Sequence, residues 1–404
     1  MSWFHTNLFL PFADPDRCSG LSRRLRSIRR FERLPEKAQR AEQQVRLQKL
    51  LQHAYDTVPF YRQQFEAVDF HPADARVDCR LPLPVLTREH VRLASNSLLS
   101  NAYKPNHLRA ASSSARAGIP VRFHRDAEGV RNKVALKLKM DTWSGLNTGD
   151  SVMMLWGANC APSRESNWQW RTFEGVFMRQ NPVPSGPVGE EILDRLRWRF
   201  ERQRPKVLYG RSSVLTAFAS HLQEHGVRHR PQTVIATASV LTAQDRRLLK
   251  SVFKTAPYIY YGSQDVGMIG AECSEHEGMH FHPWGSYVEF DPIGESHEGT
   301  VYRLLVTDLL NYGQPFIRYD TEDCVTLAPQ SCSCGRWFPL VDQVLGRIVN
   351  GAVYANGKRV TDVTLHETNR KIEPILASSF ERVTRSRPAH PRAGRRFKER
   401  SKTA

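Results

Sequence analysis

The sequence lacks both a long apolar run and a cysteine framework. A membrane-spanning helix needs about 20 mostly apolar residues, and no stretch of the 404 residues approaches this, so no such helix is expected. The first residues, MSWFHTNLFLPFADPDRC, make a poor signal peptide, because Pro11 breaks the apolar patch and no basic residue precedes it. The seven cysteines are scattered and odd in number, which does not suit a secreted disulfide framework. We therefore expect a cytoplasmic protein.

Acidic residues are scarce at the two ends of the chain, and this accounts for most of the net charge of +17. Residues 17–40 and residues 381–404 each contain nine Lys and Arg but only two acidic residues. The body between them is mildly basic, so we expect no specific nucleic-acid partner. The tail from 381 has almost no apolar content and is expected to be disordered.

Two helices are predicted near the N-terminus. In LSRRLRSIRRF the apolar residues Leu21, Leu25, Ile28 and Phe31 recur at helical spacing with arginines between them. This basic amphipathic pattern suits peripheral contact of residues 17–40 with an anionic membrane, or packing of the narrow apolar stripe onto the body. A second helix is predicted over 41–58, where the following proline ends it.

From about residue 150, short apolar runs alternate with helical patterns. The helical patterns include one closed by Gly226 and one opened by the capping pair Thr242 and Asp245. The alternation predicts a largely parallel sheet covered on both faces, with ligands beyond the carboxyl ends of the strands. After 285 the pattern changes to strands and turns, which suggests a β-rich subdomain. The predicted buried strands are SVMMLWG (151–157), PKVLYG (205–210), TVIATAS (233–239) and APYIYYG (256–262).

Two segments have the residue types of a phosphate and metal site. SSSARAGIPV (112–121) offers hydroxyl and backbone N–H donors to phosphate if it lies ahead of a helix, although it has one glycine only. In YGSQD (261–265), Asp265 is suited to Mg²⁺, which prefers oxygen ligands and bridges phosphates. The alternatives are a plain surface loop at 112–121 and a helix-capping role for Asp265.

Two further segments follow. PFIRYDTEDCVTL (315–327) crowds three carboxylates near Arg318, and a carboxylate at a strand end can accept both hydroxyls of a ribose. VLGRIVNGAVYANGKRV (344–360) suggests a hinge at Gly346-Arg347 and then a hairpin turn. The alternatives are a polar hairpin with a surface ion pair, and an ordinary arginine before two tight turns.

In this order and spacing, the four segments resemble the adenylate-forming ligases. The likeness is greatest to the phenylacetate–coenzyme A ligase group and its capsule-biosynthesis (polysaccharide) relatives, and it runs from about residue 45 to about 365. SSARAGIPV stands in the place of Ser/Thr-Ser-Gly-Thr-Thr-Gly-x-Pro, and YGSQD in that of Tyr-Gly-Ser-Thr-Glu. PFIRYDTED stands in the place of Pro-Phe-Ile-Arg-Tyr-Arg-Thr-Gly-Asp, and LGR where the hinge motif begins.

The resemblance implies an α/β fold, with a large N-terminal ligase domain, a β-rich subdomain and a truncated C-terminal lid. It implies that a carboxylic acid attacks the α-phosphorus of ATP to give an acyl-adenylate, and that coenzyme A then displaces AMP. The expected cofactors are ATP, Mg²⁺ and coenzyme A. The expected divisions are a basic segment (1–40), a ligase core (41–345), a hinge with a partial lid (346–380) and a disordered basic tail (381–404).

The resemblance also implies roles for individual residues. Asp265 would hold Mg²⁺, Asp323 the ribose hydroxyls, and Arg347 the ribose or the hinge. Tyr261, Gly262 and Ser263 would line the nucleotide and acyl pocket. The residues expected at the β- and γ-phosphates are Ser113, Ser114 and Gly118.

The sequence also departs from the family pattern. Ala115, Arg116 and Ala117 remove a flexible position and two hydroxyl donors from the phosphate loop, although Arg116 offers a compensating charge. Asp265 is one methylene shorter than the usual Glu, Glu322 replaces a glycine, and no lysine motif of the lid is visible. The alternatives are therefore a catalytically weakened homologue that only binds nucleotide, or an interaction protein that uses its basic ends.

A cysteine and histidine set resembles a zinc site of this ligase group. Three thiolates and one imidazole would form a closed tetrahedral site, which is structural rather than catalytic. His276 and His282 are rival ligands, and buried cysteines acting as small hydrophobes are the alternative. The four expected ligands are Cys273, His280, Cys332 and Cys334.

Overall fold

The computed structural model describes residues 18–94, 96–113, 120–157, 180–185, 189–296, 299–353 and 359–361. The chain divides into two units, Met1–Val363 and Thr364–Ala404. The second unit lies outside the described residues, as does the predicted tail, so all that follows concerns the first.

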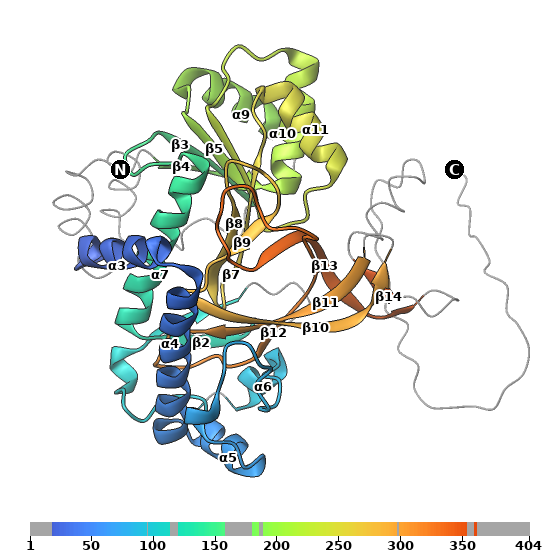
Figure 1. Cartoon of the computed structure of the whole chain (residues 1–404). Helices are drawn as coiled ribbons and strands as arrows, with labels where there is room; N and C mark the ends of the chain where they lie inside the picture. Colours follow the sequence, from blue (N-terminus) through green and yellow to red (C-terminus); the bar gives the residue numbers. More distant parts are fainter. Residues whose placement is uncertain are drawn as a thin grey trace, which may run out of the picture. The chain divides into compact units, whose positions relative to one another are not determined.

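A 12-stranded sheet forms the framework of this unit (Figure 1). Its first half is parallel and contains all four predicted strands. These strands are mostly apolar, because helices cover both faces of this half of the sheet. The order is β4-β3-β5-β6-β7. The strands are β3 (Val152–Gly157), β4 (Gln180–Ser185), β5 (Val207–Arg211), β6 (Thr233–Thr237) and β7 (Tyr258–Ser263).

The second half is antiparallel and continues the same sheet in the order β7-β8-β9-β13-β12-β11-β10, with β14 paired to β13. The β-rich part predicted after residue 285 is therefore joined edge to edge to the parallel part. The predicted hairpin in 344–360 is present as the β13–β14 pair. The strands are β8 (Gly267–Glu272), β9 (Met279–Phe281), β10 (Ser286–Ser296), β11 (Gly299–Asp308), β12 (Tyr319–Leu327), β13 (Leu340–Val353) and β14 (Arg359–Thr361).

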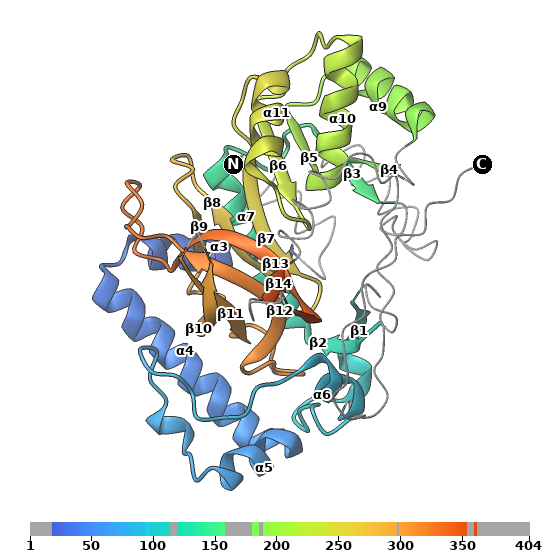
Figure 2. The ribbon, with the colours of Figure 1, turned by 90° about the vertical axis from the view of Figure 1, so that its right-hand side faces the viewer.

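Helices cover both faces of the parallel half, as predicted. On one face α9 (Glu190–Gln203), α10 (Ser212–His225) and α11 (Ala243–Phe253) share a core with Leu208. On the other face α7 (Ala127–Asp141) shares a core with strand residues such as Tyr209 and Tyr260. Figures 1 and 2 show α9, α10 and α11 grouped at the β3–β5–β6 end of the sheet.

The predicted helix signals are in place in this layer. Thr242 and Asp245 form a reciprocal capping box at the start of α11, which satisfies two backbone N–H groups. Gly226 follows the last residue of α10 with φ 76°, a conformation that glycine adopts without steric cost.

The basic N-terminal segment packs onto the body. In α3 (Leu21–Arg33) the apolar stripe of Leu21, Leu25, Ile28 and Phe31 is at most 1% exposed and joins the core beneath α7. Of the two alternatives for this stripe, packing is therefore the one observed, and the apolar side chains are not available to a membrane. No helix among the described residues is both long and apolar enough to cross one.

Two further helices form a pair. The predicted helix over 41–58 begins earlier, as α4 (Glu36–Thr57). Pro59 follows its end, as predicted, and also begins the next helix. Pro59 is the first residue of α5 (Pro59–Ala67), where its missing N–H costs nothing. Gln43 of α4 donates to the Ser286 carbonyl at 2.9 Å, which holds α4 beside β10.

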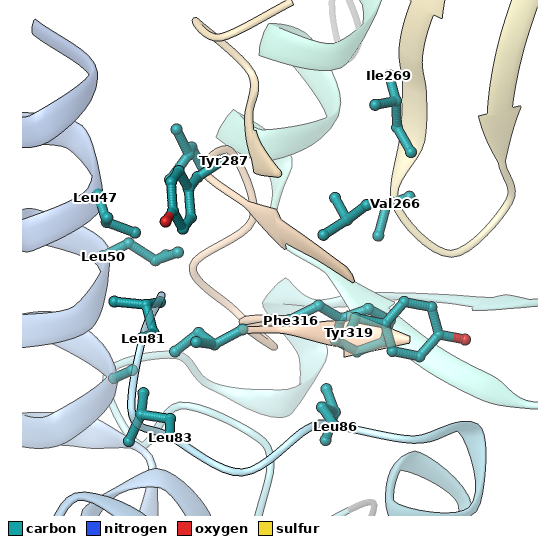
Figure 3. Packing of buried hydrophobic residues seen from close by; sticks show 14 of the residues in the cluster. Leu47, Leu50, Leu81, Leu83, Leu86, Val266, Ile269, Tyr287, Phe316 and Tyr319 are labelled. Carbon is teal, nitrogen blue, oxygen red and sulfur yellow. The ribbon is translucent and has the colours of Figure 1, made fainter. Parts of the chain in front are cut away.

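The segment between α5 and α6 (Arg88–Leu93) is hydrogen-bonded to the chain at the start of β12. Figure 3 shows the segment with Leu81, Leu83 and Leu86 running beside Phe316 and Tyr319. The Leu86 N–H donates to the Arg318 carbonyl at 3.0 Å, and the Asp320 N–H donates to the Leu86 carbonyl at 2.9 Å. This segment leads into α6 and so places α6 beside the start of β12.

Candidate functional site

The predicted phosphate loop connects two strands. β1 (Arg109–Ser112) and β2 (Arg122–Arg125) form an antiparallel hairpin, so a strand follows the loop and the condition that it lie ahead of a helix is not met. Ser113 closes the neck of the loop: its N–H donates to the Val121 carbonyl at 2.9 Å, and its Oγ accepts from the Val121 N–H at 3.2 Å. Ser114 and Gly118 lie outside the described residues, as do the substituted positions 115–117.

YGSQD occupies the turn between β7 and β8. A Cβ at Gly262 would lie 2.5 Å from the Gly267 carbonyl oxygen, so only glycine allows the two strands to approach this closely. Ser263 Oγ accepts from the Val266 N–H at 3.3 Å and supports the turn. Asp265 thus lies at a hairpin tip, and the capping alternative is wrong because no helix follows it.

Asp265 is buried in a polar cluster. It is 6% exposed, its Oδ2 accepts from the Tyr319 hydroxyl at 2.9 Å, and Arg88 Nη1 lies 3.7 Å from the same oxygen. Its Oδ1 is buried and has no hydrogen-bond partner among the described residues. Because a buried carboxylate oxygen without a donor is costly, this atom suits a cation with oxygen preference such as Mg²⁺.

Asp323 lies on β12, directly opposite Arg347 of β13. Its Oδ2 accepts from the Tyr261 hydroxyl at 2.7 Å, and Arg347 Nε lies 3.8 Å from its Oδ1. Of the three carboxylates in the segment 315–327, Asp323 is the one that is hydrogen-bonded to Tyr261. Asp320 instead faces Arg303 at 3.7 Å, and Glu322 lies 3.3 Å from Arg347 Nη1.

Two crossed hydrogen bonds join the YGSQD and PFIRYDTED segments. The tyrosine of each segment donates to the aspartate of the other, Tyr261 to Asp323 and Tyr319 to Asp265. Burial, together with the negative charge of the partner carboxylate, raises the pKa of both phenols, so each keeps its proton and remains a donor. The arrangement ties Asp265, at the turn after β7, to β12, and Asp323, within β12, to β7.

Two residues of this cluster were missed from the sequence. Tyr319 stands inside a recognised segment, and its place directly before an acidic run was the available signal. Arg88 gave no signal, because it reaches Asp265 only through the pairing of the Leu86 backbone with β12.

The four expected zinc ligands lie together. Their ligand atoms are all within 4.8 Å of one another; Cys273 Sγ lies 3.6 Å from Cys332 Sγ, and Cys334 Sγ lies 3.2 Å from His280 Nε2. Two sulfurs bound tetrahedrally to one zinc at about 2.3 Å lie about 3.8 Å apart, so the residues fit this ion.

Burial lowers the pKa of both His280 and His282, so the candidates are separated by their neighbours rather than by their protonation. Burial, then the nearby positive charge of Arg336, lowers the pKa of His280 to about 4, so its imidazole is neutral, which is the form that binds a metal. The rivals face carboxylates instead: His276 lies 3.1 Å from Glu272, and His282 lies 3.4 Å from Glu32. The role of the four residues as ligands remains a prediction.

Several known proteins are similar to this chain in sequence or in fold. No protein-family profile matches the chain. It is 24% identical over 329 residues to the phenylacetate–coenzyme A ligase of Thermus thermophilus, in a match that covers 78% of this chain and 72% of that ligase. 2-Hydroxyisobutyryl-CoA ligase in the postadenylation state, in complex with R3-HIB-AMP, has a TM-score of 0.67 at 18% identity over 85% of this chain and 75% of the other.

An open conformation of the same ligase, in complex with 2-HIB-AMP and CoA, has a TM-score of 0.66 at 18% identity and covers 85% of this chain and 83% of the other. The predicted α/β fold of the adenylate-forming ligases is therefore confirmed. The resemblance inferred from the four segments is confirmed as well: the chain is similar in sequence to a phenylacetate–coenzyme A ligase.

Proposed function

We propose that the protein uses ATP to convert a small carboxylic acid to its acyl-adenylate and transfers the acyl group to coenzyme A. The observation that carries this proposal is the pair of crossed tyrosine hydrogen bonds that join the segments of Asp265 and Asp323. The named relatives, a phenylacetate–coenzyme A ligase and 2-hydroxyisobutyryl-CoA ligase, support this reaction class.

In the proposed site each residue has one task. Asp323 accepts the ribose hydroxyls of ATP, and Arg347 lies beside it to hold the ribose or the hinge. Tyr261, Gly262 and Ser263 form the strand end that lines the nucleotide and acyl pocket. Ser113 offers its hydroxyl to the β- and γ-phosphates, and Ser114 and Gly118 complete the proposed set of donors.

Asp265 is the proposed magnesium ligand through its unpartnered Oδ1. When bound, Mg²⁺ supplies positive charge against the phosphate oxygens, where negative charge spreads in the transition state. Tyr319 keeps Oδ2 occupied and so orients Oδ1. The zinc proposed at Cys273, His280, Cys332 and Cys334 is structural, because four protein ligands leave no open position.

The direct test is ATP–pyrophosphate exchange with a panel of aromatic and short aliphatic carboxylic acids. We expect exchange with at least one acid, and a loss of roughly 100-fold or more in Asp323→Asn, because the ribose loses a charged acceptor. Asp342→Asn is the matched control, since Asp342 is exposed on β13 away from the tyrosine contacts, and it should exchange like the wild type.

A weakened, nucleotide-binding homologue is the second candidate, favoured by the shorter side chain of Asp265. Its carboxylate already lies against Tyr319 and Arg88, which limits its reach toward a phosphate-bound ion. Mg-ATP binding without exchange for any acid in the panel would identify this second function and overturn the first.

A further inference from the structure

Arg88 joins the two segments that the proposed function assigns to phosphate and metal. Its Nη2 donates to Ser113 Oγ at 2.9 Å, at the neck of the loop, and its Nη1 lies 3.7 Å from Asp265 Oδ2. The side chain is only 17% exposed, so this guanidinium is held in the cluster and is not part of the general basic surface.

The backbone of Arg88 is fixed on both sides. Leu86, two residues earlier, pairs with β12 at Tyr319, the residue whose hydroxyl holds Asp265 (Figure 3). Thr87 caps α6 through its Oγ, which accepts from the His90 N–H at 3.2 Å. The guanidinium is therefore attached to the same strand that orients the carboxylate, and the two groups are positioned together.

The contacts leave capacity for a further anion. A guanidinium has five N–H donors in a planar fork. One is directed at Ser113, and the 3.7 Å separation from Asp265 is longer than the roughly 2.8 Å of a charge-assisted hydrogen bond. A phosphate group can thus accept two N–H bonds from Arg88 while Asp265 remains close.

Arg88 places positive charge beside the proposed magnesium ligand Asp265. Asp265 carries a negative charge that repels a polyphosphate, and Arg116 and Ala117 have no hydroxyl where the pattern of the adenylate-forming ligases has two threonines. Arg88 lies between the Asp265 carboxylate and the neck of the loop. There its positive charge offsets the repulsion between Asp265 and the polyphosphate, and its N–H groups take the place of the two hydroxyl donors.

We propose that Arg88 binds the β- or γ-phosphate of ATP, and that it is the residue by which this site distinguishes ATP from AMP. This inference rests on the proposed function for the identity of the nucleotide. Its chemical content is narrower: a phosphate chain beyond the α-phosphate is recognised by a guanidinium from α6.

The test is calorimetric titration of the full chain with Mg-ATP, AMP and Mg-tripolyphosphate. In Arg88→Met we expect affinity for Mg-ATP and Mg-tripolyphosphate to fall about 10- to 100-fold, as for one charged bidentate contact, while AMP affinity stays within about twofold. Arg88→Lys should be intermediate, because it keeps the charge and loses the fork.

Arg92→Met is the matched control. Arg92 lies on the same helix, is 45% exposed, and pairs with Glu89, so its replacement should change none of the three affinities. Thermal unfolding of each variant verifies that it is folded, and Arg88→Lys serves if Arg88→Met is not.

The outcomes separate the two proposals. Unchanged Mg-ATP affinity in Arg88→Met, or equal losses for Mg-ATP and AMP, overturns the role of Arg88 alone. Binding of Mg-tripolyphosphate that depends on Arg88, without any binding of ATP, supports Arg88 and overturns the proposed function. A folded wild type that binds neither contradicts both.

Discussion

Tyr319 and Tyr261 each donate to a carboxylate that belongs to the other's segment, at 2.9 and 2.7 Å. Each bond has a buried donor and a charged acceptor, the combination that contributes most among hydrogen bonds. The site consists of these two phenols, the two carboxylates, and the guanidiniums of Arg88 and Arg347. Its geometry depends on single atoms.

The first prediction concerns Tyr319. Tyr319→Phe removes the donor to Asp265 and leaves a buried carboxylate with its oxygens poorly satisfied, so unfolding free energy should fall by about 1–3 kcal/mol. Chemical denaturation measures this, and Tyr302→Phe is the control because Tyr302 lies half-buried on β11 of the same sheet. An equal loss of unfolding free energy in Tyr319→Phe and Tyr302→Phe would show that the hydrogen bond from Tyr319 to Asp265 does not stabilise the protein.

The second prediction concerns Glu322, where the family pattern has glycine. Glu322 has φ 63°, a left-handed conformation that costs an L residue about 1–2 kcal/mol. Glu322→Gly should therefore stabilise the protein by about 1 kcal/mol in chemical denaturation.

Glu322→Ala separates conformation from charge. It removes the carboxylate that faces Arg347 at 3.3 Å but keeps a Cβ at positive φ, so no stabilisation is expected. If the alanine variant gained as much as the glycine variant, the effect would be due to charge.

At the scale of elements, the sequence predicted well where a local signal decides the structure. Thr242 and Asp245 cap α11 as expected, and the apolar runs that end at Gly157 and Gly262 are strands. Pairing between distant segments was not predictable in this way. The strand after the phosphate loop is set by its pairing with β1, and the antiparallel return at Asp265 is set by the close approach of Gly262 and Gly267.

The residues of the candidate site also differ in how far the sequence predicts them. Asp265 and Asp323 could be named from their segments, but their partners come from other elements. Arg88 reaches the site from α6 because Leu86 pairs with β12, and no periodicity or turn signal encodes that contact. The choice of His280 over its rivals likewise depends on the β9–β13 pairing that brings it to the cysteines.

The third prediction concerns the element formed by β8, β9 and the turn at Cys332. Purified wild-type protein should contain about one zinc per chain by atomic absorption. Cys332→Ser should lose it and unfold at a clearly lower temperature, because structural zinc contributes folding free energy directly. The control is Cys79→Ser, since Cys79 is exposed and outside the cluster. The same metal content in both variants would contradict the zinc site.

At the scale of the whole described unit, α3 is part of the folded body. Its apolar stripe enters the core shared by α7 and β5, and Phe31 is stacked on His282 with ring centroids 6.0 Å apart. Removal of residues 17–40 therefore opens this core. Such a deletion would not isolate the effect of the basic charge.

The fourth prediction follows from this packing. Phe31→Ala should lower the unfolding free energy by about 3–5 kcal/mol, since Phe31 is fully buried and its loss leaves a cavity. Leu93→Ala, at a side chain 71% exposed, should stay within about 0.5 kcal/mol of the wild type. A similarly small effect of Phe31→Ala in chemical denaturation would mean that α3 is a detachable segment.

Calorimetric titration with Mg-ATP tests directly whether the two aspartates form a nucleotide site, and it needs no knowledge of the acid. We expect saturable binding to the wild type that Asp323→Asn abolishes and Asp342→Asn preserves. Absence of binding to the folded wild type at millimolar Mg-ATP, or binding that is equally strong in Asp323→Asn, would contradict it.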